Sequence, residues 1–147
     1  MTSNLGSSHL LEGIDQDGEI KPEALKAVMN ELHGNFRPEF LNRLDEIIMF
    51  KPLTKNNIQG IINLLIEDLN RRLEDKELTL ELSKEAEQYI VNNAYDPYFG
   101  ARPLKRFIQK NVETLTAKLI LQDQVKPLDK IVITVENSEL VAKIREI

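Results

Sequence analysis

The sequence has no cysteine, no long apolar run and no excess of positive charge. Without cysteine, its 147 residues can form no disulfide, thiolate nucleophile or cysteine-based zinc site. No apolar run approaches the roughly 20 residues of a membrane-spanning helix, and the N-terminal residues do not resemble a signal peptide. A net charge of −5 disfavours nonspecific nucleic-acid binding, which needs clustered cations. We therefore expect a cytoplasmic protein without membrane or nucleic-acid partners.

The first third of the chain has an irregular pattern. Residues 1–21 are rich in serine, glycine and acidic side chains, and we expect a loop there. Pro22 suits the first position of a helix that Gly34 can end, and a short second helix is expected to begin at Pro38. Residues 47–50 form a continuous apolar run, which predicts a strand buried on both faces. No segment before residue 47 has the pattern of a strand. The neighbouring strands that would form a sheet with residues 47–50 are therefore expected to be missing from these residues.

The rest of the chain alternates clear helical and strand periods. The predicted elements are a long helix that Thr54 caps, a strand at 78–82, a helix that Ser83 caps, a second long helix over 104–120, and a hairpin of 131–135 and 140–144. We expect an α+β unit over residues 52–147, which is long enough to build its own core. Residues 1–51 are expected to be the tail of a different unit.

No motif of a complete enzyme is present in these 147 residues. Gly13 and Gly18 have the glycine spacing of a phosphate-binding loop, but Glu19 stands where that motif requires lysine. His9 and His33 lie far apart in the sequence and lack a plausible set of further ligands. We therefore predict no metal site.

Two arginine-containing segments are more informative. The first runs from Asn35 to Glu46 and contains Arg43, for which a surface ion pair with Glu39 is the alternative to a function. In the second, Arg102 is expected in the first turn of a helix, where a cation opposes the helix dipole. Arginine at a helix N-terminus suits a phosphate, although pairing with a neighbouring carboxylate or a solvated basic face would also explain it.

These segments resemble the Clp family of AAA+ ATPases, most closely the second ATPase module of ClpB-type disaggregases. Residues 38–45 match the family segment Pro-Glu-Phe-x-Asn-Arg-x-Asp, in which the arginine is the arginine finger. Residues 100–102 match Gly-Ala-Arg, in which the arginine is sensor 2. Thr2-Ser3-Asn4 is similar to the end of the sensor-1 strand. The Walker A and Walker B motifs of the family are absent from these residues.

The resemblance implies a fold and a set of roles. It implies an AAA+ small C-terminal (lid) subdomain at 52–147, preceded over 1–51 by the helical tail of an incomplete large subdomain. Arg43 would act as the arginine finger in trans and Asn4 as sensor 1, both in catalysis. Arg102, with Gly100 and Ala101, would contact the cofactor ATP, which binds with Mg in the full-length parent.

The implied parent is a hexameric ring that hydrolyses ATP to thread unfolded or aggregated polypeptides during stress, with an Hsp70-type co-chaperone as a further expected partner. The chain alone is expected to hydrolyse no ATP. A ClpA- or ClpC-type unfoldase that feeds a peptidase is an alternative, although residues 5–34 contain no Ile/Leu-Gly-Phe/Leu docking tripeptide. A freestanding module that assembles without nucleotide is another.

Overall fold

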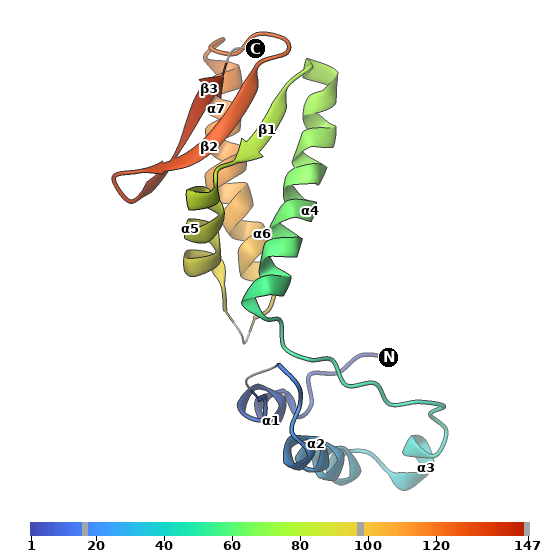
Figure 1. The fold of residues 1–147 in the computed structure, drawn as a ribbon. Helices are drawn as coiled ribbons and strands as arrows, with labels where there is room; N and C mark the ends of the chain where they lie inside the picture. The colour runs from blue at the N-terminus through green and yellow to red at the C-terminus, as the bar shows by residue number, and fades with distance from the viewer. Residues whose placement is uncertain (16–17, 97–98, 146–147) are drawn as a thin grey trace. The chain divides into compact units, whose positions relative to one another are not determined.

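The computed structural model describes residues 1–15, 18–96 and 99–145. The chain divides into two compact units, Met1–Thr54 and Lys55–Ile147 (Figure 1). Each unit has its own helices, and the second contains a three-stranded sheet.

The first unit consists of three helices, α1 (Ser7–Glu12), α2 (Pro22–Asn35) and α3 (Pro38–Leu41). The helices at Pro22 and Pro38 were predicted and are confirmed, but the prediction of a loop throughout residues 1–21 is wrong because α1 lies there. With six residues, none of them buried, α1 is too short to show the apolar period by which a sequence reveals a helix. It packs closely on α2: a Cβ added at Gly13 would lie 2.2 Å from Cβ of Ala24.

The predicted buried strand at residues 47–50 is not formed. These residues are irregular, and in the described part of the chain they pair with no strand. Ile48 is 67% exposed and Phe50 is 78% exposed. An apolar run can become a buried strand only beside other strands, and the described residues of the first unit provide none.

The second unit contains the predicted helices and strands in the predicted order. The helices are α4 (Lys55–Leu73), the 3₁₀ turn η1 (Glu74–Lys76), α5 (Lys84–Ala94), α6 (Arg102–Ile108) and α7 (Thr114–Leu121). The strands are β1 (Thr79–Leu82), β2 (Lys130–Glu136) and β3 (Glu139–Arg145). The predicted cap of α5 is confirmed, because the amide of Ala86 donates to Oγ of Ser83 over 3.2 Å.

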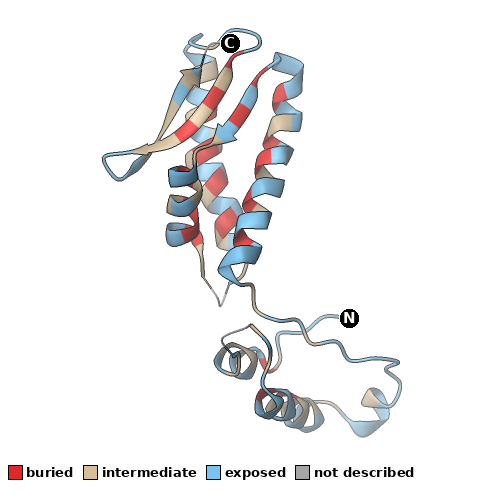
Figure 2. Ribbon diagram, viewed as in Figure 1, coloured by how far each residue is buried: buried red, intermediate tan, exposed pale blue. Residues whose placement is uncertain are grey.

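The sheet has the order β1-β2-β3, in which β1 is parallel and β3 antiparallel to β2. Asn137 and Ser138 join β2 to β3, and both have positive φ, as a tight two-residue hairpin turn requires. One face of the sheet packs on helices, with Leu80, Ile131 and Ile133 almost fully buried (Figure 2). The mixed sheet and its helices form an α+β fold, as the sequence predicts.

The second predicted long helix is interrupted by a π turn. The residues of η2 (Gln109–Glu113) adopt π geometry between α6 and α7. The side chain of Thr114 donates from Oγ1 to the carbonyl oxygen of Gln109 over 3.3 Å. The spacing of apolar residues in the sequence does not reveal this wider turn. Leu104, Ile108 and Val112 follow at intervals of four residues, as in an α-helix, and all three are buried.

Candidate functional site

Arg43 lies just beyond the end of α3. Its backbone amide donates to the carbonyl oxygen of Phe40 over 3.1 Å, which continues the turn past the helix, and its side chain is exposed. Among the described residues, no carboxylate lies within ion-pair distance of its guanidinium, so the alternative pairing with Glu39 is not formed. The guanidinium is therefore available to an anion outside these residues.

Arg102 is the first residue of α6, with Ala101 as the N-cap. The turn before it depends on Gly100, whose φ of 64° is a left-handed conformation that glycine adopts without steric cost. Gly100 donates its amide to the carbonyl oxygen of Asp96 over 3.1 Å, and the amide of Phe99 donates to Oδ1 of Asp96 over 3.3 Å. Pro97 and Tyr98, which belong to the same motif, lie outside the described residues.

Several cations follow Arg102 along the chain. The first turn of α6 contains no acidic residue, Lys105 and Arg106 lie in its last turn, Lys110 lies in η2, and all three of these cations are exposed. In the described part of the chain, Arg102 forms no ion pair, so the alternative of pairing with a neighbouring carboxylate is not realised. An exposed guanidinium beside the free amides of a helix start is suited to phosphate oxygens.

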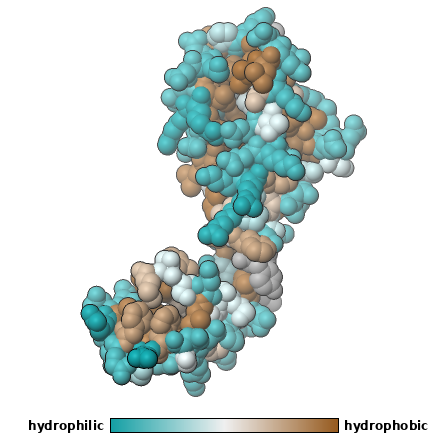
Figure 3. Space-filling view, turned by 180° about the vertical axis from the view of Figure 1, so that it is seen from behind, coloured by the Kyte–Doolittle hydropathy of each residue, from teal (hydrophilic) through white to brown (hydrophobic). Residues whose placement is uncertain are grey.

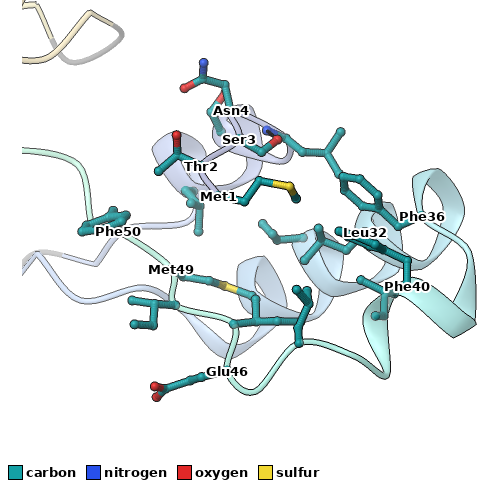
Figure 4. Close-up of a pocket in the computed structure, with 18 residues that line it drawn as sticks. Met1, Thr2, Ser3, Asn4, Leu32, Phe36, Phe40, Glu46, Met49 and Phe50 are labelled. Carbon is teal, nitrogen blue, oxygen red and sulfur yellow. Dashed lines mark hydrogen bonds between the residues drawn. The ribbon is translucent and has the colours of Figure 1, made fainter.

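Asn4 lies in the exposed N-terminal segment ahead of α1, on the rim of a hollow in the first unit. Figure 4 shows its side-chain amide pointing away from the middle of that hollow. The structure places Asn4 and Arg43 in the first unit, and Gly100, Ala101 and Arg102 in the second.

The hollow has a volume of about 480 Å³ and is mostly apolar. The rings of Phe36 and Phe40 stack beside it with centroids 5.2 Å apart, and Met49 and Phe50 line it from the irregular segment (Figure 4). Figure 3 shows apolar side chains gathered on the surface of this unit within a hydrophilic border. The sequence pointed to this surface through the apolar run at 47–50 and through Phe36 and Phe40, whereas Met1 and Leu32 join it through the fold.

Within the described residues, no group of three or more histidine, cysteine, aspartate and glutamate side chains is placed to hold a metal ion. In the same part of the chain, none of the helices has both the length and the apolar character needed to cross a membrane.

The comparison with protein families gives the decisive observation. Residues 53–133 match the model of the C-terminal, D2-small domain of ClpB protein. This chain belongs to the ClpB family. The sequence-based assignment to the Clp family is thus confirmed, and the match begins close to the division between the two units.

Relatives in the ClpB family match nearly the whole chain. The chaperone protein ClpB of Bacillus cereus is 48% identical over 145 residues, which are 99% of this chain and 17% of that protein. The chaperone protein ClpB of Enterococcus faecalis is 48% identical over 141 residues, or 96% of this chain and 16% of that protein. The chain thus spans about a sixth of the length of these ClpB proteins.

Solved structures of Hsp104 show the same fold. A Saccharomyces cerevisiae Hsp104 chain in an extended complex with casein has a TM-score of 0.82 at 30% identity, covering 99% of this chain and 25% of that one. A closed-state Hsp104 with ATPγS and casein has a TM-score of 0.81 at 32% identity, covering 98% and 24%. The fold is therefore that of the C-terminal AAA+ subdomain of these chaperones, as the resemblance implied.

Proposed function

We propose that this chain supplies the C-terminal part of a nucleotide site in an ATP-dependent, protein-unfolding chaperone of the ClpB type. The observation that carries the proposal is that Arg43 and Arg102 are both exposed and make no ion pair with any described carboxylate. Each also lies at an end of a helix within a motif of the family.

Arg102 would bind the phosphates of the nucleotide held by its own subunit. Gly100 turns the backbone sharply just before α6, and Ala101 as N-cap leaves the amides of Arg102 and Leu104 free of a side-chain cap, whereas Pro103 between them has no N–H. These amides and the guanidinium form a donor set that fits phosphate oxygens, so the residues present are suited to ATP, bound with Mg in the parent. Its role is that of sensor 2.

Arg43 would act on the nucleotide held by the neighbouring subunit of a ring. A guanidinium that is already positioned stabilises the negative charge that develops on phosphoryl oxygens during transfer. In GTPases, an arginine finger accelerates hydrolysis by about 10³–10⁵-fold. Asn4, as sensor 1, would help to orient the attacking water.

The Hsp104 relatives support a polypeptide substrate. The Hsp104 structures contain casein, and one contains ATPγS. We infer a parent that assembles as a hexamer in the cytoplasm, threads unfolded or aggregated polypeptides and works with an Hsp70-type co-chaperone under stress. The ClpA- or ClpC-type unfoldase is less well supported, because the matching family model is that of ClpB. A nucleotide-independent module would leave the two free arginines without a role.

Complementation within a mixed ring tests the two roles. The 147-residue chain would replace the matching region of Bacillus cereus ClpB, which is 48% identical to it over 145 residues. Subunits with Arg43→Ala or Arg102→Ala would be mixed with subunits whose own nucleotide pocket is disabled. Because the finger acts across a subunit boundary, the disabled subunits would supply it, and mixing should restore ATP turnover only for Arg43→Ala.

Arg71→Ala is the matched control, since Arg71 is also an exposed arginine on a helix and lies outside both motifs. It should leave turnover unchanged with and without mixing. Nucleotide titration provides a second measurement, in which Arg102→Ala should lose more affinity than Arg43→Ala. Restoration of Arg102→Ala by mixing, or equal affinity losses, would contradict the assigned roles.

A further inference from the structure

The sheet of the second unit has two edges, and the edge formed by β1 is closed by a side chain. Asn70 of α4 accepts from the amide of Leu80 over 2.7 Å and donates to its carbonyl oxygen over 3.0 Å. The Asn70 amide thereby provides both hydrogen bonds that a neighbouring strand would make with Leu80. No further strand can pair with β1 at this residue unless Asn70 moves.

The edge formed by β3 is open. The carbonyl oxygen of Ile133 accepts from the amide of Ser83 over 2.8 Å, on the side of β2 that faces away from β3. Its partner across the β2–β3 ladder is Ala142. In an antiparallel ladder such a pair is not hydrogen-bonded, so the backbone groups of Ala142 point outward from the sheet.

Alternation along β3 gives Leu140 and Ile144 the same outward backbone direction as Ala142. In the described part of the chain, none of these three residues makes a hydrogen bond on its outer side. Alternation places their side chains on the face that packs on α7, yet all three are only half-buried. Both the backbone groups and the apolar side chains of this edge therefore lack a covering strand.

The charges on β3 indicate what could cover this edge. Glu139 and Arg145 lie at opposite ends of the strand, and neither has an ion-pair partner among the described residues. Lys143, which could keep another strand away as edge lysines often do, pairs instead with Glu136 of its own hairpin.

We propose that β3 pairs antiparallel with β3 of a second copy of this chain, in the register that places Ala142 opposite Ala142 of the second copy. Leu140 then lies opposite Ile144 of the second copy, and the outward backbone groups of both strands meet. The same register places Glu139 opposite Arg145 of the second copy, twice by symmetry, and opposite charges at directly facing positions favour pairing. The contact is isologous and joins two copies of the chain in a continuous six-stranded sheet, so it is separate from the head-to-tail contacts that build the proposed ring.

Analytical ultracentrifugation of the 147-residue chain over a dilution series would measure the association. Ala142→Pro removes one outward N–H at the centre of the edge, which the β2–β3 ladder does not use and where proline is tolerated. This variant should lose the dimer while keeping the circular dichroism of the wild-type chain.

Charge exchange tests the register. Glu139→Arg places two arginines face to face and should raise the dissociation constant about tenfold, because two symmetric pairs change together. The double variant Glu139→Arg, Arg145→Glu should restore the wild-type value. Glu74→Arg, which makes the same change of charge at an exposed residue of η1, is the matched control and should have little effect.

Amide hydrogen exchange measures the contact without any substitution. At high concentration the amides of Leu140, Ala142 and Ile144 should slow, whereas those of Val141 and Lys143 should be protected at every concentration by β2. A chain that remains monomeric at the highest concentration overturns the proposal. So does a dimer that survives Ala142→Pro, or one that the charge exchange does not restore; if the proline variant fails to fold, the exchange pattern and the charge variants decide.

Discussion

Arg102 is a side chain whose position is unfavourable for the stability of its own helix. In the first turn of α6, where no acidic residue compensates it, its positive charge opposes the dipole of the helix. Such a charge costs about 0.3–1 kcal/mol at a helix end. Local rules tend to fail at functional sites, and this unfavourable placement agrees with a role in holding phosphate.

Reversing this charge should therefore stabilise the isolated chain. We expect Arg102→Glu to raise the free energy of unfolding by about 1 kcal/mol, because it removes an unfavourable cation and adds a favourable anion. Arg71→Glu is the control with the opposite sign, since Arg71 lies in the last turn of α4, where a cation is favourable. Urea unfolding of both variants measures the difference. Destabilisation by Arg102→Glu would show that the arginine contributes to the fold.

Asn70 is a helix residue whose side chain closes one edge of the sheet. It lies on α4 between the buried residues Leu69 and Leu73, and its amide occupies the backbone groups of Leu80 at the edge of β1. An asparagine next to the apolar positions of a predicted helix is visible in the sequence, but its partial burial is not. Its partner, however, belongs to a strand that only the folded chain places beside it.

We expect Asn70→Leu to lower the free energy of unfolding by about 1–3 kcal/mol, because the amide and carbonyl of Leu80 would lose their partners. Asn63→Ala, on an exposed position of the same helix, should change stability by less than about 0.5 kcal/mol. Thermal unfolding monitored by circular dichroism compares the two. Equal effects would mean that the edge of β1 needs no cap.

The start of α5 makes stability depend on pH. Hydrogen bonds from its own backbone amide and from Ser83 hold the pKa of the Glu85 carboxyl below its ordinary value. Since the folded pKa lies below the unfolded one, the stabilisation is complete above the unfolded pKa and is lost as pH falls through the folded pKa.

The difference in unfolding free energy between the wild type and Glu85→Gln should therefore be present at neutral pH and vanish in acid. Urea unfolding at a series of pH values measures it. Repeating the comparison in a Ser83→Ala background should reduce the difference, because the hydroxyl is one of its causes. A difference that stays constant with pH would show that Glu85 acts without its charge.

At the scale of the whole chain, the two units have very different cores. Among the buried apolar residues of the described chain, only Ala24 and Val28 belong to residues 1–54. The second unit buries the apolar faces of α4, α5 and α6 together with those of β1 and β2. Few buried contacts give low local stability, so the first unit should open far more readily than the second.

Hydrogen exchange on a dilute, monomeric sample should show fast exchange through residues 1–51 and slow exchange in α4, α5 and β2. The exposed residues Ile48 and Phe50 give the reason, because the first unit leaves much of its apolar surface in water. Phe50→Ser should leave exchange in the second unit unchanged. Slow exchange throughout residues 1–51 would show that this unit is stable by itself.

The sequence by itself determined the order of elements in the second unit and the family to which the chain belongs. Alternation at 131–135 and 140–144, the Ser83 cap and the helical spacing in α4 are local patterns, and local patterns can be recognised without knowledge of the fold. Contiguous motifs placed Arg43 and Arg102 as candidates for the same reason, while their roles remain predictions.

Only the tertiary structure decided the features that depend on how separate elements meet. The parallel pairing of β1 with β2 joins segments distant in the sequence. Asn70 of α4 closes one edge of the sheet, and the other edge is open at Ala142 because no further described strand lies beside β3. The run at 47–50 had the composition of a buried strand and is exposed instead. Burial depends on whether neighbouring strands exist to cover the run, and its own residues cannot encode this.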